Sequence, residues 1–372
     1  MRTRAAVLRE VGAWWSIEEV DLGAPKAHEV MVKLRASGLC HSDDHLRTGD
    51  TRIELPVIGG HEGAGVVVEL GPAVENVAVG DHVVLSFIPS CGHCWMCSTG
   101  HQNLCDLGAH ALEGPAISDG TYRVTSKGQG IGRFCQLGTF SPYVTVHEAS
   151  VVKVDPTIPL DVAALVGCGV PTGYGSAVYA AQVQPGDTCV VVGIGGVGIN
   201  AVQGARIAGA EIIVAVDPVE MKHSMAQQCG ATHVTDSIEK ALDIVRELTL
   251  GRMADSAILT VGIPSGDQVQ SLLQLVKKNG RAVVTAVAPW QTTEVSLNLQ
   301  EFVNYQKQLI GVMFGWSNPR YDIPRILRLY QHGKLFLDQL ITHRYSLDQI
   351  NDGYRDLLEG RNLRGLIDYE YS

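Results

Sequence analysis

Four cysteines close together in the first third of the chain suggest a metal site. Their spacing is C-x2-C-x2-C-x7-C, formed by Cys91, Cys94, Cys97 and Cys105. Four thiolates at this spacing can surround a zinc ion as a closed tetrahedron, which leaves no position for a substrate. We therefore expect a structural zinc here. Two alternatives are a zinc-finger module that binds nucleic acid and a chance cluster of buried cysteines.

A second set of candidate ligands is spread along the sequence. Cys40, His61 and Cys168 would together supply two thiolates and one imidazole. Three protein ligands, with a fourth position left for water or substrate, are typical of a catalytic zinc. Each residue alone is weak evidence, because a single cysteine or histidine is most often a core or surface residue. Taken together, the three predict a zinc ion with a catalytic role.

A glycine-rich loop predicts a dinucleotide site. It follows the apolar run Thr188–Val192 and opens a helix expected over Val197–Ala208. Glycines in this position let a pyrophosphate approach the helix N-terminus, where free N–H groups attract anions. Asp217, 19 residues after Gly198, would accept hydrogen bonds from ribose hydroxyls and repel a 2′-phosphate, so NAD is favoured over NADP. The alternative is a tight strand-to-helix turn without a ligand. The loop residues are Gly193, Gly195, Gly196, Val197 and Gly198.

Composition narrows the class of protein. Of the 372 residues, 45% are hydrophobic and 18% are charged, which permits a large buried core and excludes a disordered chain. The net charge of −10 argues against nucleic acid or an anionic membrane as the partner. No signal peptide or membrane-spanning segment is recognisable, so we expect a cytoplasmic protein. In that compartment the nine cysteines indicate metal binding or catalysis before disulfides.

Two patterns of elements must position these residues. In the first part of the chain, short apolar runs separated by glycine, proline and aspartate predict a β-rich unit. From Asp187, β-branched runs alternate with helical segments, which predicts a parallel sheet covered by helices. The fold class is therefore α/β plus a β-rich domain. The glycine-rich residues 106–134 are weakly periodic, as in a loop that shapes a functional surface.

The order of these motifs resembles that of the zinc-containing medium-chain alcohol dehydrogenases. The resemblance spans nearly the whole chain and includes His61, Glu62 and the Pro-Thr-Gly-Tyr-Gly run at residues 171–175. Three segments are more narrowly similar to the actinobacterial nitrosodimethylaniline-dependent subgroup, which holds NAD tightly and recycles it in place with an external electron acceptor. These segments are residues 59–65, 85–91 and 201–205. The family implies a GroES-like catalytic domain over residues 1–169 and 314–372. It also implies an inserted NAD-binding Rossmann domain, which is a doubly wound parallel sheet, over residues 170–313.

The family also implies roles for individual residues. Cys40, His61 and Cys168 are similar to the catalytic zinc ligands, with Glu62 beside the metal. Asp43 is similar to the carboxylate that orients the zinc-binding imidazole. The other matches are a proton relay through Ser42, the cofactor ribose and His45, a substrate-pocket wall at Phe87, and cofactor contacts at His41, Thr172, Lys222 and Arg364. His41 is a departure, because animal enzymes often carry arginine there, and a neutral imidazole attracts pyrophosphate less.

We therefore expect a zinc-dependent alcohol dehydrogenase with two zinc ions per chain. It would oxidise a primary or secondary alcohol to an aldehyde or ketone by hydride transfer to NAD. One alternative is a thiol-dependent formaldehyde dehydrogenase, which shares these ligands, and another is a non-catalytic nucleotide-binding sensor. The family implies a homodimer or homotetramer. The sequence identifies neither the alcohol nor any external electron acceptor.

Overall fold

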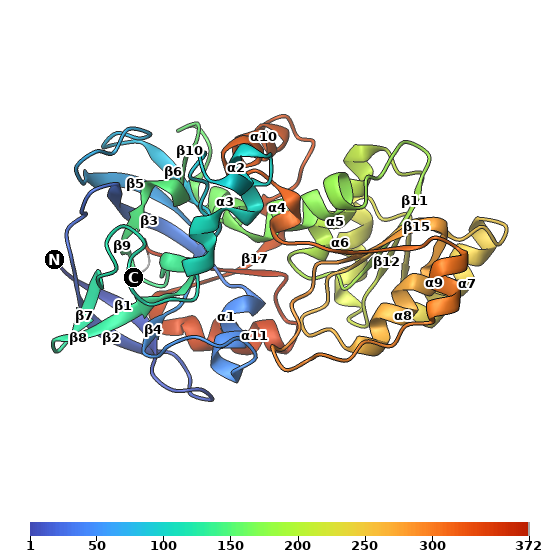
Figure 1. Ribbon diagram of the computed structural model, residues 1–372, viewed down its shortest axis with the longest axis horizontal. Helices are drawn as coiled ribbons and strands as arrows, with labels where there is room; N and C mark the ends of the chain where they lie inside the picture. The colour runs from blue at the N-terminus through green and yellow to red at the C-terminus, as the bar shows by residue number, and fades with distance from the viewer. Residues whose placement is uncertain (371–372) are drawn as a thin grey trace. The chain divides into compact units, whose positions relative to one another are not determined.

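The computed structural model describes residues 1–370, and the chain divides into two compact units (Figure 1). Unit 1 comprises residues 1–168 and the chain from residue 318 onward, and unit 2 comprises residues 169–317. Unit 1 is thus assembled from two separate stretches of sequence. Across the described residues, no helix is both long enough and apolar enough to cross a lipid bilayer.

Unit 1 consists mainly of a small barrel and an open sheet. The barrel has the strand order β1-β2-β7-β8-β4, and the sheet has the order β10-β6-β5-β3-β18-β17, with β9 paired to β3. The strands are β1 (Arg2–Leu8), β2 (Ser16–Leu22), β3 (Glu29–Gly38), β4 (Val57–Ile58), β5 (Gly63–Leu70), β6 (His82–Leu85), β7 (Val124–Ser126), β8 (Gln129–Arg133), β9 (Tyr143–His147), β10 (Val151–Lys153), β17 (Ile341–Tyr345) and β18 (Arg364–Asp368). The helices are α1 (His41–Thr48), α2 (Trp95–Ser98), α3 (Leu160–Ala164), α10 (Pro319–Gln331) and α11 (Ile350–Leu358).

Three buried aromatic rings support the loop that carries His61. Trp15 meets Phe140 edge-to-face with ring centroids 5.5 Å apart, and the Tyr354 ring lies 6.2 Å from each of them. Aromatic pairs at such separations stabilise a core beyond the area that they bury. A side chain at Gly59 would collide with Trp15 and Phe140, so the loop passes directly over these rings. The aromatic cluster therefore fixes the position of the backbone just before His61.

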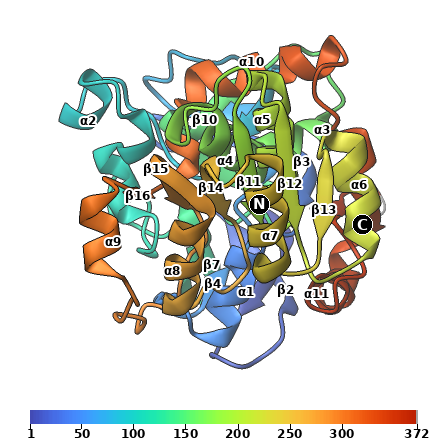
Figure 2. The same ribbon diagram turned by 90° about the vertical axis from the view of Figure 1, so that its right-hand side faces the viewer.

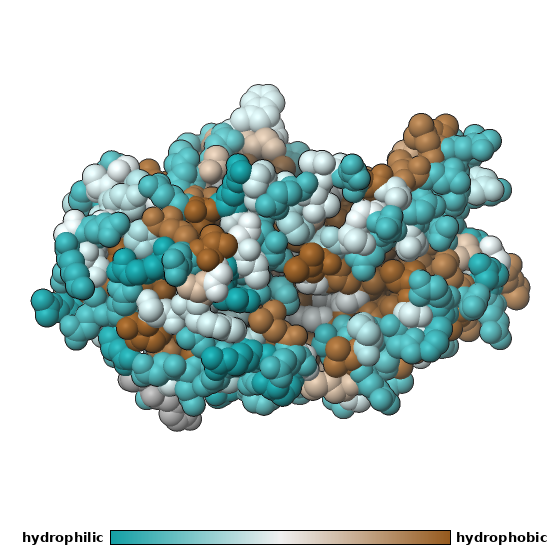
Figure 3. All heavy atoms as spheres, turned by 90° about the horizontal axis from the view of Figure 1, so that it is seen from below, coloured by the Kyte–Doolittle hydropathy of each residue, from teal (hydrophilic) through white to brown (hydrophobic). Residues whose placement is uncertain are grey.

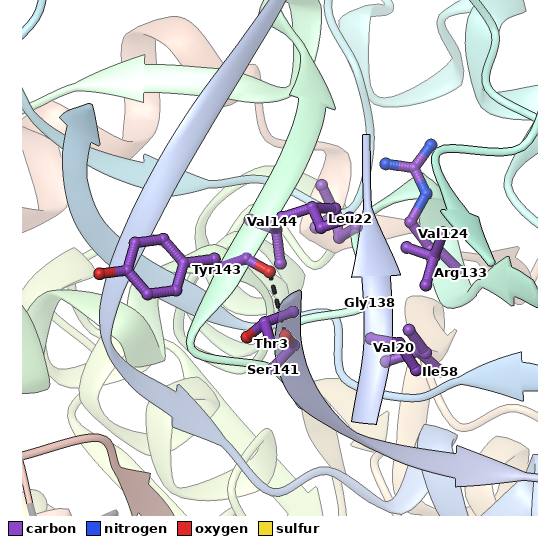
Figure 4. Close-up of a pocket in the computed structure, with 11 residues that line it drawn as sticks. Thr3, Val20, Leu22, Ile58, Val124, Arg133, Gly138, Ser141, Tyr143 and Val144 are labelled. Carbon is purple, nitrogen blue, oxygen red and sulfur yellow. Dashed lines mark hydrogen bonds between the residues drawn. The ribbon is translucent and has the colours of Figure 1, made fainter. Parts of the chain in front are cut away.

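The barrel interior is filled by side chains. Its cavity measures about 10 Å³ and is lined by residues of the barrel strands and β9, among them Val20, Ile58 and Arg133 (Figure 4). Such a volume has room for about one water molecule. The barrel is therefore a scaffold and has no space for a substrate.

Unit 2 is built on a parallel sheet with the strand order β13-β12-β11-β14-β15-β16 (Figure 2). Every residue of β11 is buried, as expected for a parallel strand covered on both faces. The predicted combination of a β-rich unit and a doubly wound parallel sheet is confirmed. The strands are β11 (Thr188–Val192), β12 (Ile212–Val216), β13 (His233–Thr235), β14 (Ala254–Leu259), β15 (Val276–Val284) and β16 (Gln308–Gly311). The helices are α4 (Gly169–Gly175), α5 (Gly198–Ala208), α6 (Met221–Cys229), α7 (Ile238–Leu248), α8 (Gly266–Leu275) and α9 (Leu299–Asn304).

Two local features differ from the sequence analysis. Residues 106–134 are not a loop throughout, because they supply β7 and β8 to the barrel. Glycine is unfavourable in strands, but Gly130 is needed here because a side chain there would collide with the Tyr122 ring. The second feature is α1, whose run of histidine, serine and aspartate has no apolar periodicity to reveal a helix. It ends at Gly49, which adopts the left-handed conformation with φ of 81°.

Replacement of Phe140 tests the aromatic cluster. We expect Phe140→Ala to lower the free energy of unfolding by about 3–5 kcal/mol, because it leaves a cavity between two rings. Urea denaturation followed by circular dichroism measures this loss. The control Val79→Ala, at a side chain that is 61% exposed, should change stability by less than about 0.5 kcal/mol. Equal effects of the two variants would contradict the assigned role of Phe140.

Candidate active site and metal centres

Four potential ligand groups meet in a buried cluster of unit 1. The ligand atoms of Cys40, His61, Glu62 and Cys168 all lie within 4.8 Å of one another. Cys40 follows β3 and precedes α1, the adjacent pair His61 and Glu62 precedes β5, and Cys168 precedes α4. We call these four residues the buried cluster. Three distant segments of the sequence thus deliver two thiols, an imidazole and a carboxyl group to one point.

The burial and hydrogen bonding of the His61 ring are those expected of a metal ligand. Both of its ring nitrogens are buried, and Nε2 has no hydrogen-bond partner among residues 1–370. A buried polar atom without a partner costs free energy, and coordination of a cation would remove that cost. Nδ1 lies 3.1 Å from Oδ2 of Asp43, which is an ion-pair distance without hydrogen-bond alignment. The imidazole therefore faces a carboxylate through one nitrogen and has the other available for a metal ion.

Asp43 is held in place by the backbone of the neighbouring loop. Its side chain is fully buried, and Oδ1 accepts a hydrogen bond of 2.6 Å from the N–H of Gly60. Gly60 has φ of 88°, a conformation that favours glycine. Burial opposes protonation of His61, but the negative charges of Asp43 and Cys40 outweigh it and raise the pKa of the imidazole well above its usual value. Asp43 thus orients the ring through Nδ1.

The two thiols of the buried cluster compete for one negative charge. A hydrogen bond from Cys168 holds the pKa of Cys40 well below its usual range, and the same interaction raises the pKa of Cys168. Without a cation, only one of the two sulfurs is readily ionised. A divalent metal ion would stabilise both thiolates at once, which is the chemistry of a Cys2His zinc site.

Arg364 supplies a positive charge to the buried cluster. Its guanidinium donates a hydrogen bond to Oε2 of Glu62, and both side chains are almost inaccessible to solvent. Gly38 makes this pair possible, because a side chain at that position would collide with the Glu62 carboxylate. Arg364 begins β18, which pairs with β3, so the end of the chain completes the site. This pairing orients the Glu62 carboxylate toward the thiols.

The residues expected to relay protons lie on α1. The Cys40 thiol lies 3.6 Å from Ser42 Oγ, which places this hydroxyl at the buried cluster. His45, one turn further along the helix, is only 3% exposed, and its Nδ1 lies 3.2 Å from Oδ2 of Asp50. The rings of His41 and His45 are 5.6 Å apart. The helix therefore arranges a hydroxyl and two imidazoles in succession.

Two phenylalanine rings cover the imidazole of His61. Phe87 and Phe134 both approach it edge-on, with ring centroids 5.7 and 5.1 Å away. Phe87 was predicted from the sequence as a wall of the substrate pocket. Phe134, which ends a stretch without a recognisable motif, was not predicted to lie here. Tyr354 was not predicted either, and its hydroxyl donates a hydrogen bond of 3.4 Å to the carbonyl oxygen of Cys40. These aromatic side chains keep water away from the ring.

The four cysteines of the C-x2-C-x2-C-x7-C motif form a second metal centre. All four are free thiols, and their sulfurs lie within 4.8 Å of one another. The Cys91–Cys97 and Cys94–Cys105 sulfur pairs are 3.9 and 4.0 Å apart. A disulfide requires about 2.05 Å, whereas zinc with bonds of about 2.3 Å places the sulfurs of a tetrahedron about 3.8 Å apart. The spacing therefore fits a closed zinc site.

Backbone N–H groups support these thiolates. The N–H of Cys97 donates to Sγ of Cys94 at 3.4 Å, and the N–H of Asp106 donates to the same sulfur at 3.5 Å. Burial disfavours the charged form, but these hydrogen bonds outweigh it and lower the pKa of Cys94 to about 7. A thiolate is the form that binds metal.

The glycine loop of unit 2 has the geometry of a dinucleotide cradle. Gly193 has φ of 89°, and its N–H donates to the carbonyl of Val216 at 2.8 Å. A side chain at Gly198 would collide with the Gly193 carbonyl, whereas a Cβ at Gly195 would meet nothing within 4 Å. The loop lies at the carboxyl end of β11, where the strand order reverses and nucleotides bind in such sheets.

Asp217 stands at the end of β12 beside this loop. Its carboxylate accepts hydrogen bonds from the N–H groups of Ile194 at 2.8 Å and Val219 at 2.9 Å. Lys222 Nζ lies 3.0 Å from the same carboxylate. Thr172 lies on α4 and is largely buried. Unit 2 contains Thr172, Asp217, Lys222 and the loop glycines, and unit 1 contains His41 and Arg364.

Loss of the four-cysteine zinc should affect stability more than chemistry. We expect Cys105→Ser to lose one zinc ion per chain and to unfold at a lower temperature, because a closed site contributes its binding energy to folding. Metal analysis and scanning calorimetry measure the two effects. His93→Gln, at an exposed neighbour that contributes no sulfur, should retain the metal content of the wild type. A Cys105→Ser protein with unchanged zinc content would contradict the assignment.

Known proteins with a similar sequence or structure identify the family. The family model "Alcohol dehydrogenase GroES-like domain" matches residues 26–156, and "Zinc-binding dehydrogenase" matches residues 196–332. Alcohol dehydrogenase B of Mycobacterium tuberculosis is 51% identical over 370 residues, which is 99% of each chain. NDMA-dependent alcohol dehydrogenase of Amycolatopsis methanolica is 50% identical over 367 residues, again 99% of each. The crystal structure of benzyl alcohol dehydrogenase from Acinetobacter calcoaceticus superposes with a TM-score of 0.92 at 32% identity and 99% coverage of both chains. The chain therefore belongs to the zinc-containing medium-chain alcohol dehydrogenases, oxidoreductases that act on CH–OH donors.

Proposed function

We propose that the protein oxidises primary or secondary alcohols to aldehydes or ketones with NAD, and that the buried cluster is its catalytic centre. The observation that carries this proposal is the convergence of Cys40, His61, Glu62 and Cys168 within 4.8 Å. A catalytic zinc would be held by Cys40, His61 and Cys168. A structural zinc would be held by the four cysteines of the C-x2-C-x2-C-x7-C motif. When bound, zinc supplies Lewis acidity that lowers a hydroxyl pKa by roughly nine units, and NAD accepts the hydride.

The residues of unit 1 divide the remaining tasks. Asp43 fixes the orientation of the His61 ring through Nδ1, so that Nε2 is available as a ligand. Ser42 Oγ accepts the hydroxyl proton of the alcohol as it passes its own proton on towards His45. His45, oriented by Asp50, releases a proton to water. The apolar edges of Phe87 and Phe134 exclude water near His61 and favour alcohols with apolar substituents.

Asp217 supports the choice of NAD. Its carboxylate is already oriented by two backbone N–H groups, so it can accept hydrogen bonds from ribose hydroxyls without reorganisation. A 2′-phosphate at the same place would meet a buried negative charge. Arg364 is a further candidate cofactor contact, because its buried Nε has no hydrogen-bond partner among residues 1–370.

We further propose that NAD stays bound between turnovers and is reoxidised by an external electron acceptor. The basis is the 50% identity to a relative named as NDMA-dependent, together with the three similar sequence segments. His41 binds pyrophosphate more weakly than arginine would, so other contacts must retain the cofactor. Native mass spectrometry of protein purified without added NAD should show one dinucleotide and two zinc ions per chain.

Unit 2 presents an edge strand that supports a homodimer or homotetramer. β16 ends the sheet, and its side chains alternate between half-buried and exposed, with Leu309 on the outside. Exposed apolar side chains continue before and after it, at Leu299, Val303, Met313 and Trp316. Hydrophobic side chains also reach the surface in several places on the face drawn in Figure 3. An unpaired edge with apolar neighbours is suited to pairing with a second copy.

The state of the nine cysteines supports a cytoplasmic location. None forms a disulfide within the described part of the chain. Thiols destined for zinc remain reduced in a compartment kept reducing by glutathione and thioredoxin.

Replacement of a proposed zinc ligand should separate chemistry from cofactor binding. We expect Cys40→Ser and His61→Ala to keep NAD but to lose at least about a thousand-fold in kcat, which corresponds to roughly 4 kcal/mol of lost stabilisation. Steady-state kinetics and the bound dinucleotide content provide the two readouts. Cys135→Ala, at a buried cysteine outside the ligand set, is the matched control and should remain active. Unchanged turnover in His61→Ala would exclude the metal mechanism.

Replacement of Asp217 should change the choice of cofactor. Asp217→Asn keeps an acceptor oxygen for one of the two backbone N–H groups, removes the negative charge and frees Lys222 to contact a 2′-phosphate. We expect the ratio of kcat/KM for NADP to that for NAD to rise at least about tenfold, or 1.4 kcal/mol. Asp217→Gly should shift the ratio in the same direction. A wild-type enzyme that prefers NADP would refute the assignment of Asp217.

A further inference from the structure

Unit 2 contains a cavity of about 500 Å³ that the alcohol dehydrogenase reaction does not use. Its walls come from α7, the turn before β14, the end of α8, the start of β15, and α9 with the turn that follows it. α7, α8 and α9 lie side by side in both ribbon views (Figures 1 and 2). The cavity therefore lies at the amino ends of β14, β15 and β16. The glycine loop follows the carboxyl end of β11, so the two regions lie at opposite ends of the parallel strands.

Positive side chains dominate the lining of this cavity. Five are basic and only Glu301 is acidic; the basic residues are Arg246, Arg252, Lys277, Lys278 and Lys307. We call these five residues the basic pocket. It occurs in a chain whose net charge is −10, so its local charge is opposite to that of the whole protein. A concentration of like charge costs free energy unless a ligand of opposite charge compensates it.

Carboxylates within the protein neutralise the pocket only in part. Arg246 pairs with Asp243 at 2.7 Å, Lys307 pairs with Glu301 at 2.6 Å, and Lys277 pairs with Asp255. Arg252 and Lys278 have no ion-pair partner among residues 1–370. Five cations against three carboxylates leave two positive charges in excess. An anion with two negative charges would balance this excess.

The lysines are held in position before any ligand arrives. Lys307 is 7% exposed, and its Nζ donates to the carbonyl of Leu273 at 2.7 Å. Lys278 and Lys307 place their Nζ atoms 5.2 and 5.7 Å from the ring centroid of Tyr305. Cation–π attraction at these distances restrains long side chains that would otherwise move freely. The anchored lysines reduce the entropy that ligand binding would otherwise cost.

We propose that the basic pocket binds a pyrophosphate-bearing anion, either free or as part of a nucleotide. Arginine and lysine side chains are the common ligands of phosphate groups, and Arg252 can offer two parallel N–H donors to one of them. The volume lies within the range of about 300–1,000 Å³ typical of small-molecule sites. The site is separate from catalysis, so it goes beyond the proposed oxidation of alcohols.

Calorimetric titration of the NAD-saturated holoenzyme with inorganic pyrophosphate tests this proposal. NAD occupies the glycine loop, which otherwise has its own affinity for pyrophosphate. We expect one pyrophosphate per chain, with an affinity that weakens as salt is added. Parallel titrations with ATP and with orthophosphate distinguish a nucleotide from a free phosphate anion. Tighter binding of ATP than of pyrophosphate indicates a nucleotide site, and equal binding indicates a pyrophosphate site.

Variants of the two unpaired cations provide the controls. The double variant Arg252→Gln with Lys278→Gln should weaken pyrophosphate binding at least about tenfold. The charge-conserving pair Arg252→Lys with Lys278→Arg should retain most of the affinity. Lys240→Gln removes an exposed charge from α7 outside the pocket and should leave binding unchanged. Circular dichroism verifies that each variant is folded. No binding at millimolar pyrophosphate, or equal affinity in the wild type and the Gln double variant, would overturn the proposal.

Discussion

The burial of several negative ligand groups at one point is the constraint on which the arrangement of unit 1 depends. Cys40, Glu62 and Cys168 can each carry a negative charge, and the guanidinium of Arg364 compensates the carboxylate of Glu62 directly. Buried charges without compensation are strongly destabilising. A divalent cation satisfies the thiolates, and the orphaned Nε2 of His61 points to the same solution. The aromatic cluster and the glycines of the 59–63 loop position these groups before the metal arrives.

Unit 2 attracts anions in two different ways. Its parallel sheet places the glycine loop at one edge, where backbone N–H groups attract an anion. At the opposite edge, long side chains provide the positive charge, and Tyr305 helps to hold them. One sheet thus offers two anion-attracting regions of different physical origin. The first is fixed by backbone conformation and the second by side-chain composition, so the second can change without altering the fold.

How much the sequence predicts depends on how local each feature is. The four cysteines of the C-x2-C-x2-C-x7-C motif lie within fifteen residues, so their spacing alone limits the geometry that they can adopt. The helix expected over Val197–Ala208 is present as Gly198–Ala208, because a glycine loop and a buried strand mark its start. By contrast, nothing in the sequence indicated that Phe134 or Tyr354 would contact the residues around His61. Such contacts arise from packing between segments far apart in the chain, and no short motif encodes them.

The discontinuous composition of unit 1 sets an order for its assembly during synthesis. Arg364 and Glu62 are 302 positions apart, and β18, which begins at Arg364, inserts beside β3 in the sheet. All of unit 2 leaves the ribosome before the final strand of unit 1 is made. Domains generally fold as units while the chain emerges, so unit 2 can fold first. Unit 1 is completed only by this strand. Until then the Glu62 carboxylate lacks its guanidinium partner, and residues 36–38 of β3 lack their β18 partners. A nascent chain therefore passes through a stage with a finished nucleotide fold and an incomplete metal pocket.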